Sequence, residues 1–311
     1  MAAKRKKKKS KTKRISFKPG SLSKKKKRKA GRFGPALISI LKVSAVACAV
    51  VAVVAILYFA EKYVKSSNPV NTGPLVLADT PGWVSEELKA KILVAAGGKT
   101  FRLDEDTAYL VVNNLASIAW LDEVQVQTTD KSVRVNAKFR KPIALIKSAL
   151  HKFYVDVEQV VLDFVPMPNL PIVEVKGLSP IAKTPPLGKV WRQDDLAAAV
   201  LILDRLDQRD KDKSVAPDKP LLYEIGSIDV SNFNGRRNTG QPHIVLYTTD
   251  NTPIIWGAEI GKWQQHLEST DEQKLAKLYG YYKEYGTLLG GAKYINLRDP
   301  QDKVPLPIDK Y

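Results

Sequence analysis

An uninterrupted apolar segment near the N-terminus constrains this chain more than any other feature. Val43–Ala60 contains no charged side chain over 18 residues, and Ala36–Leu41 continues the apolar stretch before Lys42. At about 1.5 Å per helical residue, 18 residues span about 27 Å, close to the ~30 Å hydrocarbon core of a bilayer. The segment therefore predicts an uncleaved transmembrane helix over residues 36–64. Representative residues of this predicted membrane anchor are Val43, Val50, Val54, Leu57 and Tyr58.

The segment before this apolar run is strongly basic. Residues 1–34 contain 17 Lys or Arg and no Asp or Glu. Because blocks of like charge repel each other and bury no apolar surface, we expect residues 1–35 to be a disordered tail. Lys and Arg beside a membrane span favour the cytoplasmic side, so the tail predicts a cytoplasmic N-terminus and an extracytoplasmic C-terminal domain in a single-pass inner (plasma) membrane protein.

Two other roles for the tail stay open. Its charges could contact anionic lipid or bind nucleic acid without sequence preference. The absence of aromatic residues interleaved with the lysines disfavours nucleic acid. The rest of the chain has no excess of either charge: 32 basic residues in 43–311 stand against all 32 acidic residues of the protein. With Cys48 as its one cysteine, the chain can form no intramolecular disulfide.

Residues 74–146, after a polar linker at 65–73, carry a β-α-α-β-β pattern. Ser85 is a suitable N-cap for a first helix, and two glycines at 97 and 98 end it. Asp104 opens a second helix, where its charge suits the helix N-terminus better than a catalytic role. Alternating apolar residues at 124–126 and 133–139 predict two strands. Two helices on one face of a small sheet resemble a POTRA domain.

Residues 147–311 predict a second, mixed α/β domain with an antiparallel sheet. Asp194–Leu206 reads as an apolar-rich helix, and Leu222–Val230, His243–Tyr247 and Thr252–Trp256 read as strands. The predicted fold class is therefore α+β, with a single transmembrane helix followed by two extracytoplasmic domains.

No pattern in the sequence indicates catalysis. The three histidines, His151, His243 and His266, are far apart in the sequence and lack Cys or acidic partners at metal-ligand spacing, so no metal site is predicted. The glycines at 286–291 are not followed by the Lys-Ser/Thr of a phosphate-binding loop. We therefore expect a protein without enzymatic activity, catalytic residues or cofactors.

Seven segments between Pro74 and about Pro305 carry a further pattern through their order along the chain, namely Gly97–Asp104, Ile118–Val126, Phe139–Ala144, Tyr154–Val161, Ile254–Gly257, Glu272–Leu278 and Tyr294–Asp299. In this order they resemble the bacterial cell-division protein family FtsQ/DivIB. In some of them a usual family residue is replaced: Ala119 for proline, Gln159 for glycine and Asn296 for aspartate, and the glutamate before Arg140 is absent.

The resemblance implies a scaffold of the division complex that acts in septum formation and binds FtsB- and FtsL-like single-pass proteins. It also implies that a C-terminal edge strand accepts a partner strand by β-addition. The implied partner-binding residues are Tyr294, Ile295, Asn296, Leu297, Arg298, Asp299 and Val304. Two alternatives stay open: a POTRA-bearing subunit of another envelope secretion or transport assembly, and a purely structural role for Tyr294–Arg298 as a central strand.

Overall fold

A computed structural model describes residues 48–63, 71–148, 151–180, 184–212 and 219–300. The chain divides into two compact units, residues 1–68 and residues 69–311. The predicted tail at 1–35 lies outside the described residues.

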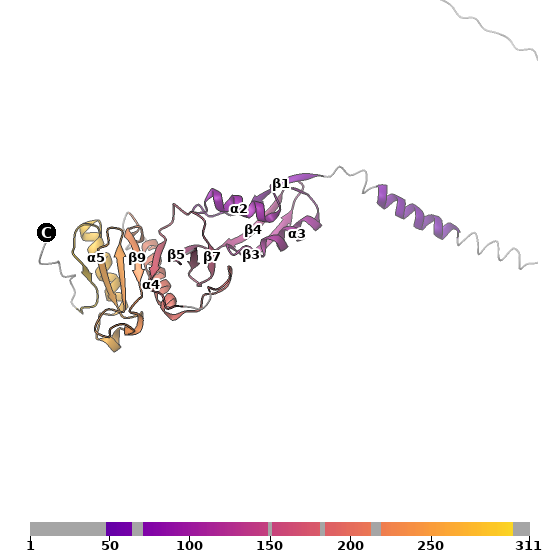
Figure 1. The fold of residues 1–311 in the computed structure, drawn as a ribbon. Coiled ribbons are helices and arrows are strands. Elements are labelled where there is room, and N and C mark those ends of the chain that lie inside the picture. The colour runs from indigo at the N-terminus through magenta and orange to yellow at the C-terminus, as the bar shows by residue number, and fades with distance from the viewer. Residues whose placement is uncertain (1–47, 64–70, 149–150, 181–183, 213–218, 301–311) are drawn as a thin grey trace, which may run out of the picture. The chain divides into compact units, whose positions relative to one another are not determined.

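The predicted single transmembrane helix is wrong. The described part of the first unit is a helix at residues 48–63 (Figure 1). Among the described residues, no helix has both the length and the apolar character needed to cross a membrane. Four anchor residues lie on this helix with more than half of their surface exposed, namely Val50, Val54, Leu57 and Tyr58. Val43 lies outside the described residues.

The second unit begins with a four-stranded sheet in the order β2-β1-β4-β3. Its strands are β1 (Thr72–Leu77), β2 (Thr100–Arg102), β3 (Leu121–Thr128) and β4 (Val133–Phe139). Strand β1 runs parallel to β4 and antiparallel to β2, and β4 runs antiparallel to β3. The predicted β-α-α-β-β order is therefore present, with the short strand β2 added between the helices.

The two helices beside this sheet begin where the sequence predicts, and the first also ends where it predicts. Ser85 accepts a hydrogen bond from the backbone N–H of Leu88 at the start of α2 (Glu86–Ala96), and Gly97 ends α2 at φ 113°. Asp104 accepts one from the N–H of Thr107 at the start of α3 (Glu105–Leu115). The buried side chains of the two helices are Leu88, Ile92, Ala96, Val111 and Leu115.

The larger sheet has eight strands in the order β12-β11-β10-β9-β8-β5-β6-β7. Their bounds are β5 (Pro142–Lys147), β6 (Lys152–Asp156), β7 (Val161–Asp163), β8 (Val173–Lys176), β9 (Ile225–Asp229), β10 (Ile244–Thr248), β11 (Pro253–Gly257) and β12 (Ile295–Asn296). We predicted an antiparallel sheet, but the sheet is mixed. The pairs β5–β8, β8–β9 and β11–β12 are parallel. Long crossover segments explain the last two, because parallel neighbours cannot be joined by a tight hairpin.

Those crossovers contain the helices that cover the larger sheet. Helix α4 (Asp194–Lys211) lies between β8 and β9, and α5 (Asp271–Tyr285) lies between β11 and β12. The two helices contact each other where the Tyr279 hydroxyl donates to the backbone oxygen of Leu206 at 3.0 Å. Three 3₁₀ turns complete the fold, namely η1 (Leu221–Glu224), η2 (Phe233–Gly235) and η3 (Trp263–His266).

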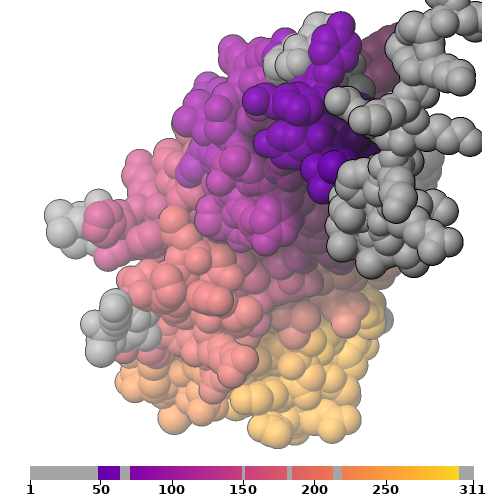
Figure 2. All heavy atoms as spheres, turned by 90° about the vertical axis from the view of Figure 1, so that its right-hand side faces the viewer, coloured from indigo at the N-terminus to yellow at the C-terminus, as the bar shows by residue number. Residues whose placement is uncertain are grey.

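Strands β6 and β7 belong to two hydrophobic cores at once. On β6, Val155 packs into the core under α4 and α5, while Tyr154 packs into the core of the smaller sheet. On β7, Val161 and Leu162 divide in the same way. Side chains alternate between the faces of a strand, so these two strands join the smaller and larger sheets into one packed unit (Figure 2).

Candidate functional site

The predicted partner-binding segment lies at an edge of the larger sheet. Strand β12 pairs with β11 alone in the strand order, with Ile254 opposite Ile295 and Ile255 opposite Asn296. The N–H of Leu297 donates to the oxygen of Ile255 at 3.0 Å. In each pair of a parallel ladder, one residue bonds to both neighbours of its partner, and the backbone groups of the partner face the other way. The bond from Leu297 shows that Ile255 is the bonding residue here, so the N–H and C=O of Asn296 point away from β11.

The side chains of this segment divide into buried and accessible groups. Ile295 and Leu297 are completely buried in the core, whereas Tyr294 is 39% exposed. Arg298 is half-buried and Asp299 is exposed. The last predicted partner-binding residue, Val304, lies outside the described residues. A polar substitution of Leu297 would therefore test the fold, whereas Tyr294 and Asn296 are accessible residues on β12 or directly before it.

A buried carboxylate holds the end of β12. Glu268 Oε1 accepts from Arg298 Nε at 2.8 Å, and its Oε2 accepts from Lys274 Nζ at 2.7 Å and from the N–H of Ala258 at 2.9 Å. Burial raises the pKa of Glu268, but these bonds outweigh burial and bring the pKa below its ordinary value. The N–H of Ser269 also donates to the oxygen of Arg298 at 2.7 Å, so strand pairing is closed beyond Arg298.

The opposite edge of the larger sheet is covered by the chain itself. The N–H of Val161 on β7 donates to the oxygen of Lys189 at 2.9 Å, and the oxygen of Val161 accepts from Gly188 at 2.8 Å. Val160 and Val190 form a further antiparallel bridge. Of the two edges of this sheet, β12 is the one whose outer backbone N–H and C=O groups, among the described residues, face away from the sheet.

A charged cleft of about 290 Å³ lies beside β4, β5 and α4. Arg140 crosses it and donates to Asp122 at 2.8 Å, to Asp156 at 2.9 Å and to Glu158 at 2.6 Å. Burial raises the pKa of Asp156 despite the opposing effect of Arg140. Because its charges are paired with one another, this cleft fits a structural ion-pair network better than a catalytic site.

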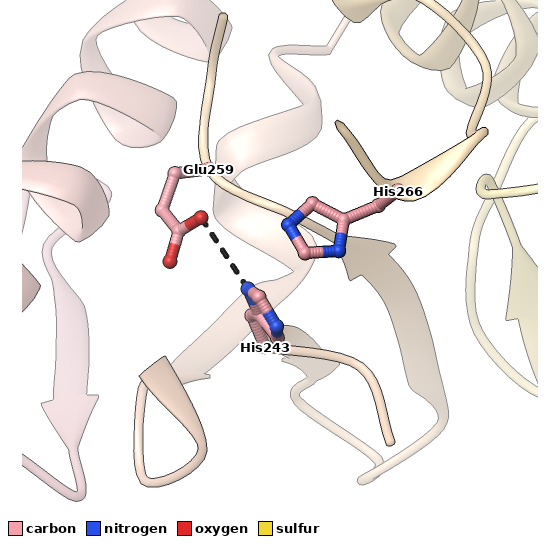
Figure 3. A group of neighbouring side chains, drawn as sticks. All are labelled: His243, Glu259 and His266. Atoms are coloured by element: carbon pink, nitrogen blue, oxygen red, sulfur yellow. Dashed lines mark hydrogen bonds and ion pairs between the residues drawn. The ribbon is translucent and has the colours of Figure 1, made fainter. Parts of the chain in front are cut away.

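Two of the three histidines meet on the larger sheet, together with an acidic residue (Figure 3). His243 precedes β10, Glu259 follows β11, and His266 ends η3. His243 Nδ1 lies 3.3 Å from Glu259 Oε2. The centroids of the two imidazole rings are 4.6 Å apart, and the ring planes make an angle of 77°. One potential ligand atom from each of the three residues lies within 4.8 Å of the other two.

We predicted no metal site because the histidines are widely spaced in the sequence, whereas the structure places two of them beside an acidic residue. His243, Glu259 and His266 are separated by 16 and 7 residues and come from three different segments, so no ligand motif marks them. Only the pairing of β10 with β11 brings these segments together. His151 is exposed at the start of β6 and is not a member of this group.

Comparison with models of known protein families finds no family that matches the chain, and comparison with curated proteins finds no relative.

Proposed function

We propose that the protein is a non-enzymatic scaffold that binds an extended segment of another protein along the outer side of β12. Strand β12 is an edge strand whose Asn296 directs both backbone groups away from the sheet, and this observation carries the proposal. An unpaired strand edge binds a second chain through its backbone, while neighbouring side chains give specificity. The resemblance to FtsQ/DivIB supports FtsB- and FtsL-like division proteins as the partners.

The backbone contribution to such binding is small. Asn296 and, two residues before it, Tyr294 offer roughly four outward backbone groups between them. At about 0.5–1.5 kcal/mol each, these hydrogen bonds supply a gross gain of a few kcal/mol, before the cost of ordering the partner segment. Specific binding therefore requires contact with side chains, and the Tyr294 ring is the nearest accessible aromatic group on the segment.

The experiment uses variants that change the edge without opening the core. Asn296→Pro removes the outward N–H, whereas no bond to β11 depends on that group. Tyr294→Ala removes the half-exposed ring, and Tyr109→Ala, on the exposed face of α3, is the matched control. The full chain is purified together with the FtsB- and FtsL-like proteins of the same organism, and complex formation is measured.

We expect Asn296→Pro and Tyr294→Ala to weaken binding at least tenfold while all variants melt cooperatively, and Tyr109→Ala to bind normally. Unchanged binding by both edge variants would remove β12 as the site. A fluorescent fusion that never gathers at the site of cell constriction would remove the division role.

A further inference from the structure

We propose that His243, Glu259 and His266 bind a divalent transition-metal ion, with Zn²⁺ as the first choice. Two imidazole nitrogens and one carboxylate oxygen are a donor set that zinc accepts readily. Imidazole also suits Cu²⁺, Ni²⁺ and Co²⁺, whereas Mg²⁺ and Ca²⁺ favour sites made of oxygen atoms alone.

The spacing of the donor atoms agrees with a tetrahedral centre. With Zn–N and Zn–O distances of about 2.0–2.1 Å, neighbouring ligands in a tetrahedron are about 3.3 Å apart. The distance between His243 Nδ1 and Glu259 Oε2 is 3.3 Å. One donor atom of each of the three residues lies within 4.8 Å of the other two, so a small movement of the side chains brings His266 to the same centre.

Glu259 is held in place by a strained turn. The N–H of Asn234 donates to Glu259 Oε1 at 3.0 Å, which leaves Oε2 directed at His243. Asn234 itself has φ 54°, a left-handed conformation that is strained for most residues and that asparagine adopts at a smaller cost. Bonds of this kind from the surrounding protein orient the ligands of metal sites.

The loop before His243 is held equally firmly. The Asn232 side-chain amide donates to the backbone oxygens of residues 238, 241 and 242 at 2.8–3.1 Å. Its oxygen accepts from the N–H groups of residues 237 and 238, both at 2.9 Å. At Gly235, with φ 70°, an added Cβ would lie 3.4 Å from His243 Nε2. The imidazole is therefore confined between this turn and Glu259.

The negative charge of the buried Glu259 also favours a bound cation. The side chains of His243 and Glu259 are each 6% exposed, and within the described ranges no Lys or Arg forms an ion pair with Glu259. By contrast, the buried carboxylates of Asp195 and Glu268 pair with Arg236 and Lys274.

A bound ion would connect three segments: the loop before β10, the loop after β11, and η3. With three protein ligands, at least one coordination position is left for water. The expected effect of the metal is a more stable C-terminal part of the sheet, because an ion that binds the folded state alone raises its stability.

The test uses the full chain without a polyhistidine tag, in a Cys48→Ser background that removes its one thiol. After treatment with a chelator, Zn²⁺ alone is titrated by calorimetry, and the visible absorption of Co²⁺ reports the coordination geometry. The first variant is His266→Ala, because His266 is half-buried and its loss disturbs the fold least. Glu259→Gln keeps the shape of the carboxylate, and His151→Ala removes the exposed histidine outside the group as the matched control.

We expect one equivalent of Zn²⁺ to bind to the parent chain and to His151→Ala, with at least tenfold weaker binding by His266→Ala and Glu259→Gln. Zn²⁺ should also raise the melting temperature of the first two proteins and leave that of His266→Ala unchanged. A cooperatively folded parent chain that binds no Zn²⁺, or equal binding by all four proteins, would overturn the proposal.

Discussion

Trp120 donates its indole N–H to Asp163 Oδ1 over 3.1 Å, and this hydrogen bond connects the smaller sheet to the larger one. Trp120 precedes β3 and is completely buried, whereas Asp163 ends β7. Lys91 of α2 pairs with the same carboxylate. The Trp120 ring also meets the Tyr154 ring edge to face at 6.1 Å, so one side chain contacts both parts of the shared core.

We expect Trp120→Phe to lower the free energy of unfolding by about 1–3 kcal/mol, because it deletes the hydrogen bond and leaves a small cavity. Trp83→Phe is the control, since Trp83 is only half-buried and its ring meets that of Phe139. Urea denaturation of the two variants measures the difference. Equal losses in both variants would show that the connection between the sheets adds no stability.

The carboxylate of Glu268 predicts how stability depends on pH. Its pKa in the folded protein is lower than the ordinary value of 4.5, so the unfolded chain binds more protons between these two pKa values. The stabilisation by Glu268 is therefore complete above about pH 4.5 and is lost as the pH falls through the folded pKa. We expect Glu268→Gln to lose this part of the pH dependence.

At neutral pH, Glu268→Gln should cost about 3–5 kcal/mol, because the completely buried Lys274 loses its carboxylate partner. The measurement is the free energy of unfolding of both proteins between pH 7 and about pH 3, where the two curves should converge as the pH falls. Parallel curves would mean that other carboxylates set the acid response.

Alanine substitutions at two glycines in the same region distinguish the cost of a steric clash from the cost of backbone strain. Gly257 has φ 95°, and an added Cβ would lie 2.2 Å from a Glu268 carboxylate oxygen. Gly261 has φ 84°, and its Cβ would meet no atom within 4 Å. We expect Gly261→Ala to cost about 1 kcal/mol for the left-handed backbone, and Gly257→Ala to cost at least about 2 kcal/mol more. Thermal melts compare them, and similar losses would contradict a tightly held Glu268.

Local patterns predicted most of the helices and strands because their causes are local. The caps Ser85 and Asp104 act on the first turns of their own helices, and the glycines after α2 and α5 allow the left-handed residue that ends each helix. Gln159 has φ 61°. The backbone of that turn therefore adopts the left-handed conformation that favours glycine.

The prediction of a transmembrane helix over residues 36–64 was wrong, because no helix in the part of the chain that the structure describes is both long enough and apolar enough to cross a membrane. The direction of the strands was also mispredicted in part. A strand pattern contains no information about whether its neighbour in the sheet precedes it by a hairpin or by a crossover through a helix.

The sequence by itself determined the α+β content, the positions of the capped helices and the segments that form strands, since neighbouring residues fix these features through backbone geometry and side-chain alternation. Tertiary structure alone decided that β12 lies at a sheet edge, that Leu297 is core, and that His243, Glu259 and His266 share one site. The physical reason is that strand order and crossovers bring together side chains that are distant in the chain, and no local pattern records those pairings.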